Sequence, residues 1–429
     1  MQKDATANSK LKIAIVTLCR VLLGITFVVF GFIRACNPVI GAGMVNDYLE
    51  AAGLTFFQPL STPLAMSFAA AEFAIGICSL LGTNIRKTSL YTVLLLGFLT
   101  PFSFYTAFVS PVTGNHQIAG LPTSDRMSFW LYVVWLTTAI LIFIWRKYSK
   151  SVFSNRIEWA IGPISLAFSI CVSITSYVKL PMVDLSPYHP GTDLRPFTID
   201  NKLTDEEVQW DENELFSTKH GYRITTPEGI EAPALQIYSK GEGDITKSIT
   251  DHKGYTFLLV AEDLREASTS ARHQINDIYD YARDNNYRFY CLTATKADGN
   301  IAEEYCVESG GAEYPVVNAD RRVLSNMIQS NPGLILVKDG TIYRMWSHFG
   351  MPTFEGKLEE NEEATLQTQS VRKKFFSLLG DFAIILAIIL ALDKLVDFIK
   401  WGWNRMKSAK AQPAPTTVEV AQEGESAKN

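Results

Sequence analysis

The apolar stretch at residues 13–32 most constrains what this chain can fold into. Its only clearly polar members are Thr17, Arg20 and Thr26, so it suits a helix that crosses a bilayer. Twenty helical residues at about 1.5 Å each span about 30 Å, the thickness of the hydrocarbon core. The stretch is longer than the core of a signal peptide, and no A-x-A cleavage pattern follows it. We therefore predict a membrane-spanning helix that the mature protein retains.

Five further apolar runs are long enough for the same role, at residues 63–81, 90–109, 128–145, 157–178 and 375–392. Basic residues gather before the first run, in the turns at 82–89 and 146–156, and after the last run. Because basic residues are retained on the cytoplasmic side, this pattern predicts that both termini are cytoplasmic. Six helices give the same parity. The protein is then multi-pass, the lipid bilayer is its first partner, and residues 179–370 are extracytoplasmic.

The segment at 179–370 differs in composition from the apolar runs around it. It contains 32 acidic and 18 basic residues, an excess of 14 negative charges. Because a nucleic-acid partner requires a cationic face, this balance argues against one. Strand patterns at 255–260 and 287–293 alternate with helical patterns at 267–284 and 300–309, and a hairpin pattern follows at 333–345. This order predicts an α/β unit.

The predicted fold class is therefore an α-helical membrane bundle of about six helices joined to an α/β soluble domain. Its parts are a membrane domain with five helices at 1–178, an extracytoplasmic domain at 179–370, and a sixth membrane helix at 375–400. Residues 401–429 are predicted to form a disordered cytoplasmic tail, because their far end is rich in Ala, Pro and Glu and poor in large apolar residues.

A set of residues in the membrane part carries a family resemblance: Arg20-Val-Leu-Leu-Gly24, Phe27, Gly31-Phe32, Asn37-Pro38, Tyr48-Leu49, Gly53-Leu54, Glu72 and Gly76. With these residues, the region at roughly 15–147 resembles the DoxX family of small bacterial inner-membrane proteins, and the likeness extends weakly into 177–194. The resemblance implies a bacterial inner membrane as the location. It also implies an association with redox chemistry, since the family has been linked to quinone-coupled or thiol-related reactions.

The soluble segment carries a second resemblance. Asn331-Pro332-Gly333, followed by four apolar residues and Lys338-Asp339-Gly340, is similar to the proline loop and final hairpin of the thioredoxin fold. The resemblance implies a thioredoxin-like domain from about residue 240 and a cis proline. Thioredoxins place C-x-x-C after the first central strand, but residues 261–270 contain no cysteine. Dithiol exchange needs two thiols, so this thioredoxin-like domain is expected to be degenerate. The loop at 110–125, where related DoxX proteins often have a cysteine pair, has none either.

Arg20 and Glu72 are the ionisable residues within the first two apolar runs. Counted from the cytoplasmic ends of their helices, their depths differ by roughly 5 Å, within reach of two long side chains. Pairing would offset much of the cost of burying each charge in hydrocarbon. We predict that they form a membrane polar centre. It either binds a quinone-like or other head group or relays protons, or it is a helix–helix lock without chemistry.

Cys291 and Cys306 are the two cysteines of the soluble segment, on a predicted strand and the following helix. They form a disulfide if their alpha carbons lie within about 7 Å, and otherwise they are buried, unreactive residues. The histidines have no ligand spacing, so we predict no metal site. No catalytic triad can be argued either.

These observations favour a non-catalytic binding or assembly module. In this hypothesis, a docking loop at Asn331, Pro332 and Gly333 contacts a periplasmic or membrane protein partner, and no cofactor is required. The alternative is a membrane redox protein that holds quinone near Arg20 and Glu72 and cycles the two cysteines of the soluble segment as a thiol pair.

Overall fold

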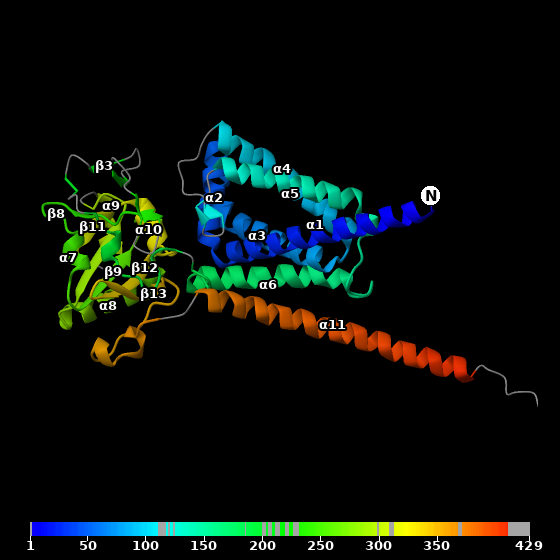
Figure 1. Cartoon of the computed structure of the whole chain (residues 1–429). Coiled ribbons are helices and arrows are strands. Elements are labelled where there is room, and N and C mark those ends of the chain that lie inside the picture. Colours follow the sequence, from blue (N-terminus) through cyan, green and yellow to red (C-terminus); the bar gives the residue numbers. More distant parts are fainter. Residues whose placement is uncertain are drawn as a thin grey trace, which may run out of the picture.

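The computed structural model describes residues 2–109, 117–118, 121–122, 125–184, 186–199, 203–204, 208–210, 215–218, 223–225, 231–297, 300–308, 313–367 and 371–410. The chain folds into a helical domain, made of α1–α6 and α11, and an α/β domain that lies at one end of it (Figure 1).

The long helices of the helical domain are α1 (Gln2–Cys36), α3 (Ser61–Leu81), α4 (Ile85–Phe108), α5 (Asp125–Ile144), α6 (Glu158–Lys179) and α11 (Val371–Lys410). Shorter helical elements are α2 (Pro38–Ala51), η1 (Thr55–Leu60) and η2 (Arg146–Tyr148). Among the described residues, six helices are long and apolar enough to cross a membrane, and they coincide with the six runs read from the sequence.

The antiparallel pair α1 and α3 forms the centre of the helical domain. Glycines let the two backbones approach closely, as small residues do between membrane helices. A Cβ added at Gly31 would lie 2.5 Å from the backbone nitrogen of Phe73, and one at Gly76 would lie 2.6 Å from that of Val28. These contacts fix which residues of α1 face which residues of α3.

Helix α11 extends further than the sequence predicted. It continues to Lys410, so the first ten residues of the predicted disordered tail at 401–429 are helical, and residues 411–429 lie outside the described part. No proline interrupts the helix before Pro413. The helix is attached to the rest of the domain at Phe382 and, near its middle, at Asp393. Phe382 stacks on Phe168 with ring centroids 4.4 Å apart, and the Asp393 carboxylate accepts the backbone N–H of Ser154 at 2.9 Å.

The α/β domain is built on a seven-stranded mixed sheet in the order β13-β12-β9-β10-β11-β7-β8. Strands β9, β10 and β11 are parallel, and β12 and β13 form an antiparallel hairpin beside β9. The strands of this sheet are β7 (Ile237–Ser239), β8 (Gly243–Asp244), β9 (Tyr255–Val260), β10 (Arg288–Thr293), β11 (Val316–Ala319), β12 (Gly333–Lys338) and β13 (Thr341–Ser347).

The remaining elements of the chain are short. The helices of the α/β domain are η3 (Arg195–Phe197), α7 (Thr246–Thr250), η4 (Thr269–Ala271), α8 (Arg272–Asp284), α9 (Asn300–Glu308), α10 (Arg321–Met327), η5 (Leu358–Glu360) and η6 (Glu362–Ala364). Three two-stranded ribbons pair β1 (Gln117–Ile118) with β2 (Leu121–Pro122), β3 (Val208–Trp210) with β4 (Phe216–Thr218), and β5 (Arg223–Thr225) with β6 (Glu231–Pro233).

Both faces of the central strand β9 are covered, which explains why its sequence is a continuous apolar run. Leu258 and Val260 belong to one hydrophobic cluster, which includes residues of α7 and α10. Phe257 and Leu259 point to the opposite face and belong to a second cluster, which includes residues of α8 and α9. The mixed α/β domain and the strand predicted at 255–260 are thus confirmed.

Candidate functional site

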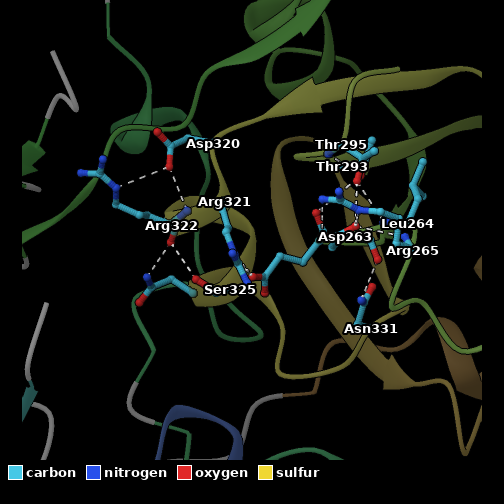
Figure 2. Close-up of polar contacts among 12 residues, drawn as sticks. Asp263, Leu264, Arg265, Thr293, Thr295, Asp320, Arg321, Arg322, Ser325 and Asn331 are labelled. Carbon is cyan, nitrogen blue, oxygen red and sulfur yellow. Dashed lines mark hydrogen bonds and ion pairs between the residues drawn. The ribbon is translucent and has the colours of Figure 1, made fainter. Parts of the chain in front are cut away.

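The loop that follows β9 occupies the position where the thioredoxin resemblance expects two thiols. Figure 2 shows that Asp263 organises this loop. Its carboxylate accepts the backbone N–H of Arg265 at 3.0 Å and the hydroxyl of Thr295 at 3.2 Å, and it forms a 2.9 Å ion pair with the Arg265 guanidinium. Burial alone would raise the pKa of Asp263, but the hydrogen bonds from Arg265 hold it below its usual value. The carboxylate is therefore a charged structural anchor.

The proline loop lies directly beside this anchored loop (Figure 2). The side-chain amide of Asn331 donates to the carbonyl oxygen of Asp263 at 2.9 Å, and the carbonyl of Asn331 accepts the N–H of Ser268 at 3.0 Å. The Asn331–Pro332 peptide bond is cis. Two segments about 65 residues apart in sequence are thus held together at the carboxyl end of β9.

Exposure differs sharply between the two loops. Pro332 and Gly333 are buried and Asn331 is half-buried, so the proline loop itself presents little surface. The exposed side chains beside it belong to Arg265, Glu266, Thr269 and Ser270, which we call the loop surface. It carries charges of both signs and hydroxyl groups but no sulfur.

The other side of the proline loop faces the helical domain. The Gln329 side chain donates to the Asn37 side chain at 3.2 Å, immediately after the end of α1. Asn37 in turn donates to the carbonyl of Val183 at 3.1 Å. The Ser347 hydroxyl, at the end of β13, donates to the carbonyl of Val178 in α6 at 2.5 Å. We call these three contacts the junction, and they brace the α/β domain against the helical domain.

Within the helical domain, the structure pairs Glu72 with Arg34 and not with Arg20. Arg34 Nη1 lies 2.5 Å from Glu72 Oε2, and Arg34 Nη2 donates to the Tyr132 hydroxyl at 3.4 Å. The predicted Arg20–Glu72 pair is wrong because the close contact of Gly31 with Phe73 sets a register between α1 and α3 in which Arg34, not Arg20, is level with Glu72. Counting from the ends of the apolar runs did not give this register.

Arg20 instead lies at the end of α3, where its Nη1 donates to the Ser149 hydroxyl at 2.7 Å and to the Lys150 carbonyl at 2.8 Å. One signal in the sequence could have identified Arg34 as the partner of Glu72. Arg34 is a basic residue at the predicted extracytoplasmic end of the first run, where the positive-inside rule does not explain a basic residue.

Cys291 and Cys306 are both free, and both pack in the hydrophobic cluster beneath α8 and α9. Cys291, on β10, has no exposed surface, and burial raises the pKa of its thiol well above the usual value. Cys306, on α9, is half-buried, and burial raises the pKa of its thiol as well. The placement of Cys291 corresponds to the buried, unreactive alternative, whereas Cys306 is only partly covered. No group of three His, Cys, Asp or Glu residues suited to a metal ion occurs within the described residues.

Comparisons of this chain with models of known protein families, with curated proteins and with solved structures find no match.

Proposed function

We propose that this chain is a non-catalytic binding or assembly protein, anchored in a bacterial inner membrane, with a DoxX-like helical domain and a degenerate thioredoxin-like domain outside the cytoplasm. The observation that carries the proposal is the network of Asp263, Arg265 and Asn331, which fixes a sulfur-free loop where a redox protein would carry its thiols. Its partner is a protein of the membrane or of the extracytoplasmic space.

A loop fixed in this way suits recognition, because a preformed surface loses little conformational entropy on binding. Three hydrogen bonds hold the loop. The Thr295 hydroxyl accepts the backbone N–H of Leu264. Asn331 accepts the backbone N–H of Ser268 and donates to the carbonyl of Asp263. The loop surface remains exposed. The junction adds a second constraint, since the hydrogen bond from Gln329 to Asn37 fixes the position of the proline loop relative to the helical domain.

The docking role predicted for Asn331, Pro332 and Gly333 is thereby refined. Because Pro332 and Gly333 are buried, a partner meets the loop surface, and the proline loop acts as its support. Asn331 connects the two, since its side chain reaches the backbone of Asp263.

The proposal can be tested by site-specific photo-crosslinking in membranes of the native host. A benzoylphenylalanine probe at Thr269, in η4, should give one discrete protein adduct. A probe at Asp284, at the far end of the following helix α8 and about 20 Å away, should not. Asn331→Ala should weaken the Thr269 adduct at least fivefold by releasing the loop. Asn285→Ala is the matched control, because it also removes one side-chain bond to a backbone carbonyl, at 2.9 Å, but far from the loop. Equal adducts from both probe positions, or none from Thr269, would refute the proposal.

A second candidate function is a quinone-linked membrane redox protein. It is favoured by one observation, the gathering of Arg34, Glu72 and Tyr132 among apolar helices. A purified protein that contains quinone, and loses it in Glu72→Gln, would support this function. The cysteines give it little support, because the thiol of Cys291 is enclosed.

A further inference from the structure

Arg20 is a buried cation without an acidic partner. The residue is 7% exposed, and none of the ion pairs among the described residues includes it. Nη1 makes two hydrogen bonds, to Ser149 and Lys150, and Nε is enclosed without a partner. Nη2 donates no hydrogen bond within the described part of the chain, and it is not enclosed. One edge of the guanidinium is therefore open to a ligand.

The groups around Arg20 compensate its charge only in part. Gly82, with φ of 71°, caps the carboxyl end of α3 and lies against the guanidinium, so that a Cβ at this position would collide with Nη1. The end of a helix is equivalent to about −0.5 of an elementary charge, which neutralises at most about half of the cation. The Ser149 and Lys150 oxygens are neutral acceptors. At least about half of the positive charge of Arg20 is therefore left uncompensated.

The electrostatic surroundings favour an anion at this position. The adjoining turns carry five cationic side chains, at Arg86, Lys87, Arg146, Lys147 and Lys150. Fewer acidic side chains reach these turns. The Glu158 carboxylate accepts the backbone N–H of Asn84 at 3.2 Å, and the Asp393 carboxylate accepts that of Ser154 at 2.9 Å. Asp397 is paired with Arg156. The excess of positive charge raises the local concentration of anions and stabilises one bound next to Arg20.

The position within the helical domain agrees with a membrane-surface ligand. Ser149 and Lys150 lie ahead of α6, whose opposite end leads into the α/β domain, so Arg20 lies at the end of the helices away from that domain. In the orientation that we propose, this end faces the cytoplasm. Basic pockets between membrane helices on that side bind anionic lipid head groups, and the planar guanidinium fork matches phosphate oxygens.

We propose that Arg20 binds one phosphate group at this end of the helical domain, through the Nη2 edge and with support from the cationic turns at 82–88 and 146–150. The phosphate belongs either to the head group of an anionic membrane lipid or to a soluble phosphate compound. This site is separate from the loop surface and does not depend on the function proposed for it.

The test is native mass spectrometry of the full chain in mild detergent, titrated with phosphatidylglycerol, phosphatidylethanolamine or inorganic phosphate. The wild type should bind one phosphatidylglycerol molecule at least tenfold more tightly than Arg20→Gln does, and phosphatidylethanolamine should not show this difference. Lys373→Gln, which removes an exposed cation at the start of α11, at the opposite end of the helical domain, should change the affinity by less than twofold. Competition by inorganic phosphate would assign the site to a soluble phosphate compound.

Two results would overturn the proposal. One is an Arg20→Gln protein that binds phosphatidylglycerol as tightly as the wild type. The other is a wild type that does not distinguish the two lipids and does not bind inorganic phosphate. If Arg20→Gln does not fold, the wild type alone decides the question. Its unfolding temperature should rise saturably with phosphatidylglycerol or inorganic phosphate and stay constant with phosphatidylethanolamine, and the absence of any selective rise refutes the site.

Discussion

The pairing of Glu72 with Arg34 makes a quantitative prediction that separates the structure from the pairing suggested by sequence. The two charged atoms lie 2.5 Å apart, and the Glu72 side chain is 8% exposed. At an effective dielectric constant of about 20, Coulomb attraction at this distance is about 7 kcal/mol. Desolvation of both groups offsets part of it, so we expect a coupling energy of about 2–4 kcal/mol.

The measurement is a double-mutant cycle with Arg34→Met and Glu72→Leu, followed by circular dichroism during unfolding in mixed micelles of dodecyl maltoside and sodium dodecyl sulfate. Each single variant leaves one charge buried and should lower the free energy of unfolding by about 3–5 kcal/mol. The double variant removes both charges, so it should be less destabilised than the sum of the two single variants.

The matched control is a second cycle with Arg20→Met and Glu72→Leu. Because Arg20 contacts Ser149 and Lys150 instead of Glu72, these two changes should be additive to within about 0.5 kcal/mol. A coupling energy above about 1 kcal/mol with Arg20, together with additivity for Arg34, would refute the helix register described above.

Three further predictions concern packing, pH and thiols. Gly31→Ala should destabilise the helical domain by about 1–3 kcal/mol in the same micelle assay, because the new Cβ meets the backbone of α3. Gly97→Ala, which has open space around it, should not destabilise the domain. Equal effects of the two changes would argue against the close approach of α1 and α3. Burial raises the pKa of Asp184 to about 6, so the folded state binds a proton that the unfolded chain loses at about pH 4. Stability should therefore fall by up to about 3 kcal/mol as the pH rises from 4 to 6, and unfolding of Asp184→Asn should lack this dependence. In differential alkylation, Cys306 should react in the folded protein and Cys291 only after denaturation, and a disulfide between them in intact cells would contradict the structure.

The sequence was sufficient for features that arise from local hydrophobic patterns. The six long apolar helices are visible as long, mostly apolar runs, because a helix able to cross a hydrocarbon core needs about twenty mostly apolar residues in sequence. Strand β9 was predicted with its observed ends, since a strand covered on both faces is a short apolar run with polar flanks. The lack of thiols at residues 261–270 is also a property of the sequence alone.

The structure of the C-terminal helix shows where local reasoning fails. Hydropathy marks where the apolar residues of α11 end but not where its backbone hydrogen bonds end, so the helix continues past the predicted boundary to Lys410. Polar residues such as Lys and Arg are good helix formers, and a helix that leaves the bilayer need not stop at its surface.

Only the tertiary structure decided which polar groups meet. The sequence placed Glu72 within reach of some cation, but the choice of Arg34 depends on the register between α1 and α3, which Gly31 and Gly76 set by close backbone contact. In the same way, Asn331 could be recognised as part of a proline loop, but its contact with Asp263 arises from the pairing of β12 with β9. The physical reason is common to both cases. The position of a residue in the hydrophobic pattern indicates whether that residue is buried or exposed. Its interaction partner depends on how two segments distant in sequence pack together.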